Sequence, residues 1–109
     1  MENKKQFIYV LKPIPSLLKE ENWTTHEEEI VQKHFNKLQK LLSEGKLILA
    51  GKTDGLNSDT FGIVILEVDN KAEAEKIMLA DPAVVEGIMT AVLYPYNVAL
   101  IQNRKPANQ

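Results

Sequence analysis

The sequence contains no cysteine, and this and other absences narrow what the protein can be. Without cysteine there is no disulfide, no thiolate nucleophile and no cysteine-based zinc site. No N-terminal apolar stretch has the length of a signal peptide or a membrane span. Basic residues are scattered, and the formal net charge is −2, so no positive stripe favours nucleic acid. We therefore expect a cytoplasmic protein that binds neither nucleic acid nor a membrane.

The residues that are present describe one ordinary globular domain. The chain has 109 residues, of which 44% are hydrophobic and 26% are charged. This length is enough to bury an independent core but too short to divide into two domains. We assign residues 1–109 to a single domain, with a core over about residues 6–101 between polar termini.

The first part of the chain predicts a strand followed by a helix. The apolar run 7–11 is ended by the prolines of "KPIP", and a polar loop over residues 12–24 contains the single tryptophan, Trp23. Thr25 is followed three residues later by Glu28, which is the pattern of a helix capping box. A helix is expected from there to Gly45, which suits a left-handed stop.

That helix has an apolar stripe which contains a histidine. Apolar residues recur at three- and four-residue spacing with His34 among them, while Lys33, Asn36, Lys37 and Lys40 are expected on the opposite side. The residues of the stripe are Ile30, Val31, His34, Phe35, Leu38, Leu41 and Leu42. A titratable ring is thus predicted on the buried side of the helix.

The second part of the chain predicts three strands and one further helix. Residues 47–50 and 61–68 read as an antiparallel hairpin with a long connection, and residues 70–80 contain strong helix formers. Asp81 and Pro82 then suit the cap and first position of a short helical turn. Residues 89–101 are expected to form the last strand, with Pro95 tolerated only at an edge or bulge.

The resulting order, βαββαβ, predicts an α+β, ferredoxin-like fold, in which an antiparallel four-stranded sheet carries two helices on one face. The strands "FIYVL", "LILA" and "GIVILEV" are apolar at nearly every position, which indicates burial on both faces. A second copy of the chain, packed sheet against sheet, would cover the face that the helices leave open. We therefore expect a closed, two-fold homodimer.

Few residues suggest chemistry. "GKT" at residues 51–53 lacks the spacing of a phosphate-binding loop, and "DGLNSD" lacks that of a calcium loop. His26 and His34 are eight residues apart, about 12 Å along a helix, which is too far to share a metal ion. A buried His34 beside a carboxylate would be a candidate general base, although a backbone carbonyl could equally satisfy it. Tyr9, Tyr94 and Tyr96 could bind a ligand or simply pack on the sheet.

The stretches "HFNKLQKLLSEGKLILAG", "GIVILEV", "AEAEKIMLADPAVVEGI" and "YPYNVAL" together resemble the YCII-related (YciI-like) domain family over nearly the whole chain. The resemblance implies a dimeric α+β barrel of ferredoxin-like subunits, related in architecture to muconolactone isomerases. It also implies an active site built on a His-Asp pair, to which His34 and Asp81 correspond. The family often has an aromatic residue after "DP", where this chain has Ala83.

On this basis we predict a small enzyme that needs no cofactor and no metal. His34 and Asp81 would act as a general acid/base pair on a small organic substrate, while Tyr9, Gly51 and Tyr94 are assigned to substrate binding. Isomerisation next to a carbonyl, or an elimination such as the dehydrochlorination known in some members of the family, fits such a pair. The alternative is a dimeric binding or protein-interaction module without catalysis, in which the two residues only maintain the shape of a pocket.

Overall fold

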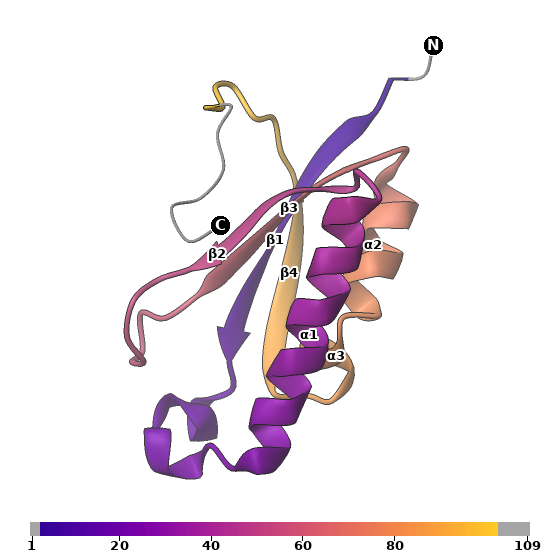
Figure 1. The fold of residues 1–109 in the computed structure, drawn as a ribbon. Coiled ribbons are helices and arrows are strands. Elements are labelled where there is room, and N and C mark those ends of the chain that lie inside the picture. The colour runs from indigo at the N-terminus through magenta and orange to yellow at the C-terminus, as the bar shows by residue number, and fades with distance from the viewer. Residues whose placement is uncertain (1–2, 103–109) are drawn as a thin grey trace.

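The structure, a computed structural model that describes residues 3–102, places four antiparallel strands in one sheet with the helices on one side of it (Figure 1). The elements in chain order are β1 (Lys5–Pro13), the 3₁₀ turns η1 (Pro15–Leu18) and η2 (Glu20–Asn22), α1 (Thr25–Ser43), β2 (Leu47–Lys52), β3 (Gly62–Val68), α2 (Lys71–Leu79), α3 (Pro82–Val85) and β4 (Met89–Pro95). The strand order is β2-β3-β1-β4. The predicted βαββαβ order and ferredoxin-like fold are confirmed.

Helix α1 begins with a capping box, but one residue earlier than the sequence pattern indicated. Thr24, rather than Thr25, is the N-cap, and its backbone N–H donates to Glu27 Oε1 at 2.8 Å, so the predicted partner Glu28 is also wrong. The sequence contains two overlapping Thr-x-x-Glu patterns, and the capping pattern alone does not choose between them. The predicted stop is confirmed, since α1 ends at Ser43 and Gly45 has a left-handed φ of 77°.

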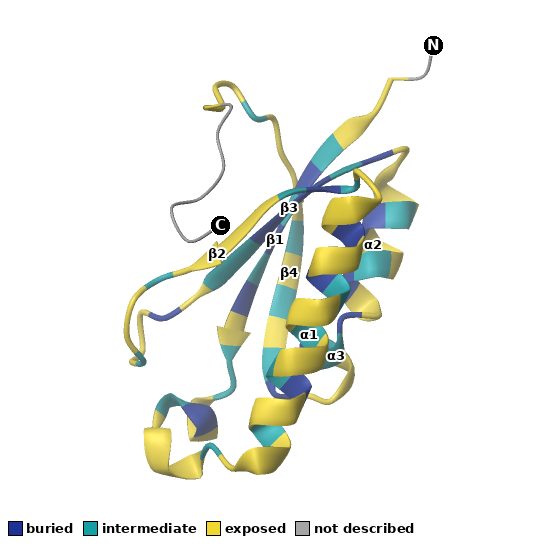
Figure 2. Cartoon of the chain, in the orientation of Figure 1, coloured by how far each residue is buried: buried dark blue, intermediate teal, exposed yellow. Residues whose placement is uncertain are grey.

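The sheet buries one face against the helices. In β1, Phe7, Tyr9 and Leu11 alternate toward that side, and they pair with Leu66, Val64 and Gly62 of β3. Figure 2 shows the buried positions in the central strands and where the helices approach the sheet. Since side chains alternate along a strand, this register places Ile8 and Val10 on the other face.

That other face is apolar, and no helix or strand among residues 3–102 packs on it. Ile8 and Val10 are joined there by Tyr94 and Val92 of β4, which are 50% and 51% exposed, and by Leu49 of β2, which is 40% exposed. The apolar second face that the sequence predicts is therefore present, and we call it the open face.

Two other predictions about the elements are wrong. The last strand ends at Pro95 instead of residue 101, since proline has no N–H to donate to a ladder. Phe35 and Leu42, which were placed on the buried stripe of α1, are 53% and 50% exposed, because the sheet covers only the narrower stripe that includes Leu38 and Leu41. Among residues 3–102, no helix is long and apolar enough to cross a membrane.

The apolar interior consists of two clusters. The larger lies between the sheet and the C-terminal part of α1 with α2, and it includes Tyr9 and Leu38. The smaller lies beside η1 and α3, and it includes Ile30 and Ala83, with Trp23 packed against it. His34 lies between Ile30 and Leu38, one turn from each along α1. It therefore lies where the two clusters meet.

Candidate active site

The site is organised around Asp81, which occupies the corner between α2 and α3. Asp81 is the N-cap of α3, and Pro82 takes the first helical position, as the sequence predicts. Its Oδ1 accepts the backbone N–H of Ala83 at 2.9 Å. The residue is 1% exposed, so its carboxylate is held inside the protein beneath α1.

Two further side chains donate to this carboxylate. His34 of α1 lies with its Nδ1 2.7 Å from Asp81 Oδ1, and Tyr9 of β1 places its hydroxyl 2.7 Å from Asp81 Oδ2. Tyr9 has no exposed surface and the His34 side chain is 13% exposed. Three elements that are far apart in the sequence thus meet at a single buried carboxylate.

The other donors to this carboxylate indicate which nitrogen of the histidine faces it as a donor. Burial and the neighbouring Asp81 carboxylate raise the pKa of the Tyr9 hydroxyl far above its usual range, so the hydroxyl keeps its proton and donates it. With Tyr9 and the Ala83 N–H both donating, an ionised Asp81 acts only as an acceptor. Toward an acceptor of this kind, His34 Nδ1 acts as the donor, and Nε2 is the ring nitrogen that points away from Asp81.

This Nε2 atom is available to a ligand. It makes no hydrogen bond to any of residues 3–102, whereas a histidine with only a structural role usually has both nitrogens occupied by the protein. No buried side-chain nitrogen or oxygen in the described chain lacks a partner, so an unpartnered Nε2 has to reach the surface. The pair therefore combines a buried, fully bonded carboxylate with an accessible imidazole nitrogen.

The structure does not bring all the predicted site residues to this place. Tyr9 is there, but as a buried partner of Asp81 rather than on a surface. Gly51 pairs with Ile63 and Tyr94 pairs with Ile8, which puts both on the open face, across the sheet from His34. Gly51 lines a shallow hollow of about 210 Å³ there. The three residues assigned to substrate binding thus lie on two sides of the sheet.

The bond from Tyr9 to Asp81 is the part of the network that the sequence analysis missed. Every position of "FIYVL" is apolar or aromatic, so the pattern does not say which alternate residues face the helices. A polar hydroxyl inside an inward-facing set, together with a buried carboxylate elsewhere, is the signal that would have suggested a pair.

Among residues 3–102, no three His, Cys, Asp or Glu side chains gather where they could hold a metal ion.

These features define a class of protein: a small, single-sheet α+β domain of ferredoxin-like topology that carries a buried Tyr-Asp-His network under its helices. The chain belongs to the YCII-related domain family, whose model matches residues 7–94. The predicted family is therefore confirmed.

One solved structure shares the fold over most of both chains. It is 5-chloro-2-hydroxyhydroquinone dehydrochlorinase (TftG) from Burkholderia phenoliruptrix, in complex with 2,5-dihydroxybenzoquinone. The similarity covers 84% of this chain and 93% of that chain, with a TM-score of 0.64 and 19% sequence identity. At this identity the likeness concerns the fold alone. No protein of curated function matches the sequence.

Proposed function

We propose that the protein is a small acid/base enzyme in which His34 is the proton-transferring group and Asp81 its orienting partner. The observation that carries the proposal is the asymmetry of the imidazole, with Nδ1 bonded to Asp81 at 2.7 Å and Nε2 unpartnered among residues 3–102. A general base needs this arrangement, since one nitrogen has to be held so that the other meets the substrate in a defined orientation.

The reaction follows from what one such base can do. Nε2 would take a proton from a carbon next to a carbonyl, or from a phenolic hydroxyl, and return it at another position or release it. The Asp81 carboxylate would stabilise the imidazolium that forms between the two steps. Isomerisation and elimination both fit this sequence of transfers, and neither reaction changes the oxidation state of a cofactor.

Dehydrochlorination is the elimination that the similar structure suggests. Loss of HCl from a chlorinated hydroxyhydroquinone removes one proton and one chloride ion, and the bonding electrons that remain form the quinone, so no external oxidant is needed. TftG is named for this substrate class. We extend the class of reaction to this chain as a proposal, with a small hydroxylated aromatic compound as the substrate.

We further propose that the working form is a homodimer. The open face carries Ile8, Val10, Val92 and Tyr94, on which no helix or strand of residues 3–102 packs, and burial of apolar surface is favourable by roughly 25 cal/mol per Å². A second sheet packed on this face would cover it in both copies at once.

The test is an activity assay with a matched pair of histidine variants. 5-Chloro-2-hydroxyhydroquinone is offered to the protein and chloride release is measured, while proton exchange into other candidate substrates is followed in D₂O by NMR. His34→Asn is expected to lower the rate by about 100-fold or more, since general base catalysis is worth that much. His26→Asn is the control, because it changes the other histidine of α1, which lies in the first turn away from Asp81.

The thermal melting of both variants separates catalysis from folding. The proposal expects His34→Asn to remain folded at the assay temperature while activity is lost. If the activity of this variant merely follows its folded fraction, or if it equals that of His26→Asn, His34 is a structural residue and the enzymatic proposal is wrong.

A further inference from the structure

A cleft of about 280 Å³ opens between α2 and the C-terminal half of α1, on the helical side of the molecule. Its apolar surface comes from Leu41 of α1 and Ile77 of α2. The cleft is separate from the hollow on the open face, because the two share no residue. A space of this size between two helices can hold a small organic molecule.

The rim of this cleft is rich in positive charge. Four lysines and two glutamates line it, which gives a net charge of +2 on a chain whose overall charge is −2. The lysines are Lys37, Lys40, Lys46 and Lys76, and the glutamates are Glu44 and Glu73. The local charge is therefore opposite in sign to that of the whole protein, and it favours an anion.

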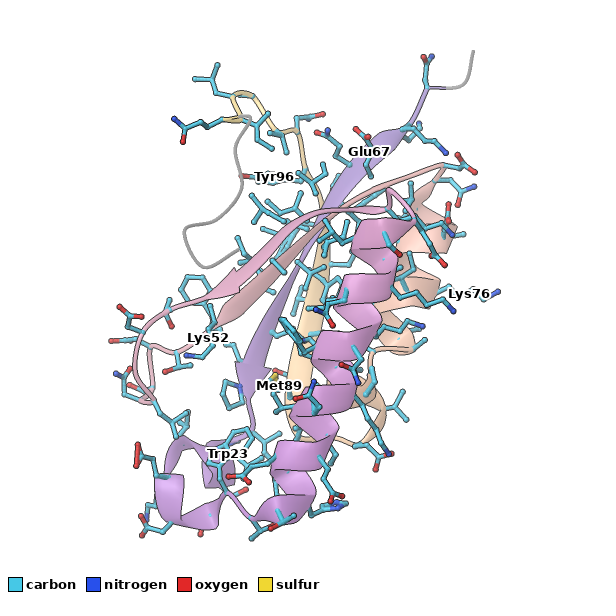
Figure 3. The ribbon with its side chains drawn as sticks, in the orientation of Figure 1. Trp23, Lys52, Glu67, Lys76, Met89 and Tyr96 are labelled. Carbon is cyan, nitrogen blue, oxygen red and sulfur yellow. The ribbon has the colours of Figure 1, made fainter. Side chains whose placement is uncertain are left out.

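Only part of this charge is neutralised inside the protein. Lys46 lies 3.2 Å from Glu73, whose pKa is lowered by the backbone N–H of Asp69 and by Lys46, so these two opposite charges offset each other. Lys37 and Lys40 have no partner among residues 3–102. Figure 3 shows Lys76 extending from α2 toward the solvent, which leaves the two lysines of α1 as the principal cations of this wall.

The favourable effect of a cation at the C-terminal end of a helix explains the position of Lys40 but not that of Lys37. Lys40 lies in the last turn of α1, where a cation also stabilises the exposed carbonyl groups. Lys37 lies before that turn and was predicted on the solvent side, yet it is half-buried and lines the cleft. Lys37 has no carboxylate partner among residues 3–102, so its ammonium group is free to bind an anion.

The cleft is lined by residues that are close in the chain to His34 and Asp81, although neither of these two residues lines it. Lys37 follows His34 by one turn on α1, and Ala80, which lines the cleft, directly precedes Asp81. At 1.5 Å per residue, Lys37 and Lys40 lie about 4.5 Å and 9 Å beyond His34 along the helix. An aromatic ring with one acidic substituent is long enough to reach from His34 to these two lysines.

We propose that Lys37 and Lys40 bind the carboxylate of a small organic acid, whose apolar body lies between Leu41 and Ile77 and whose reacting end lies at His34 Nε2. This inference rests on the proposed function, because it names the substrate class of the same site: acidic, rather than neutral, hydroxylated aromatic or short-chain compounds. The lysines select and orient this substrate and take no part in proton transfer.

The test compares an acid with its neutral amide. 4-Hydroxybenzoate and 4-hydroxybenzamide have nearly the same shape, and their binding to the full chain is measured by titration in ¹H–¹⁵N NMR at millimolar concentrations. The acid is expected to shift the signals of residues 37–44 and 76–80 and to bind about tenfold more tightly than the amide. The double variant Lys37→Gln/Lys40→Gln should remove this preference, whereas Lys5→Gln/Lys19→Gln, which removes the same charge from exposed sites outside the cleft, should keep it.

The outcomes separate this inference from the proposed function. Equal binding of acid and amide, no shift with the acid, or equal weakening in both double variants overturns the carboxylate site. His34→Asn should bind 4-hydroxybenzoate within about threefold of the native chain, because the lysines are unchanged. If tight binding of the acid requires Lys37 and Lys40, but His34→Asn leaves chloride release and proton exchange intact, the acid/base function fails and the anion site stands. If His34→Asn abolishes activity, but binding of the acid does not require the two lysines, the acid/base function stands and the acidic substrate is rejected.

Discussion

The two faces of the sheet are built from the same strands but are completed in different ways. On the helical face, Tyr9 is fully buried and its one polar group is bonded to Asp81. On the open face, Val92 and Tyr94 are about half exposed, and no helix or strand of residues 3–102 packs on them. The first face is covered by helices of the same chain, whereas the second is the face on which we propose that a second copy packs.

The difference shows how β1 serves two purposes. Its inward residues, such as Tyr9, support the candidate site, and its outward residues, such as Ile8 and Val10, support the proposed interface. Since neighbouring residues of a strand point to opposite sides, a change at one of these positions should affect one face and leave the other intact. The predictions below test this separation, from the largest expected effect to the smallest.

Val92→Asp should break the open face. A two-fold interface would contain the new carboxylate twice, and burying unpaired charge is costly, so the dimer dissociation constant should rise about 1000-fold or more, which is about 4 kcal/mol. Analytical ultracentrifugation across a concentration series measures this change. Leu79→Asp, which places the same charge on an exposed position of α2, should leave the constant unchanged. A native chain that is monomeric at all concentrations would contradict the prediction.

Asp81→Ala should break the helical face. It removes the acceptor shared by Tyr9, His34 and the Ala83 N–H, and two of these donors are buried, so the free energy of unfolding should fall by about 3 kcal/mol. Urea denaturation followed by circular dichroism measures the loss. Asp59→Ala, in the exposed loop between β2 and β3, should change stability by less than about 0.5 kcal/mol. Similar losses in the two variants would show that the buried network contributes nothing.

Tyr9→Phe removes one hydrogen bond of the network and keeps the ring. The expected loss of stability is about 1 to 2 kcal/mol, because the Asp81 Oδ2 is left without a donor while the apolar packing remains. The same urea titration detects it. The dimer constant should not change, since Tyr9 faces the helices, and a change there would argue against the separation of the two faces.

Raising the pH above 10 should lower the free energy of unfolding by a smaller amount, through the same Tyr9–Asp81 hydrogen bond. The pKa of Tyr9 is raised from 10.0 in the folded state, so above about pH 10 the unfolded chain releases this proton while the folded chain keeps it. Stability from this group is thus complete below pH 10 and falls above it, by at most about 1.4 kcal/mol per pH unit. The stability difference between the native chain and Tyr9→Phe should shrink from pH 10 to pH 11. A constant difference would show that Tyr9 ionises normally.

The sequence predicts the fold, and it singles out the two residues of the candidate pair, His34 and Asp81, for identifiable reasons. Apolar runs and breakers located every strand and both longer helices, and "DP" located the cap of α3, because aspartate and proline have strong positional preferences there. The helical period placed His34 on the inner side of α1, and the family resemblance supplied Asp81 as its partner. These are local signals, which one segment of sequence is enough to carry.

What the sequence does not predict depends on contacts between segments. Tyr9 meets Asp81 only because the register of β1 on β3 turns its side chain toward the helices, and a strand that is apolar throughout contains no sign of that register. Lys37 lies on the border of the helical stripe, and only the position of α2 makes it part of a cleft. The strand register also places Gly51 and Tyr94 on the open face, away from His34, and the sequence pattern does not reveal this either.

The Tyr9 to Asp81 bond also has a consequence for synthesis. Tyr9 and Asp81 are 72 residues apart, and β1 lies between β3 and β4, which the ribosome makes much later. The first strand to emerge therefore waits for its neighbours, and contacts of such long sequence separation slow folding. The His34–Asp81 pair cannot assemble on a nascent chain that ends before residue 81. The candidate site is therefore complete only after β1 has paired with the strands that are made later.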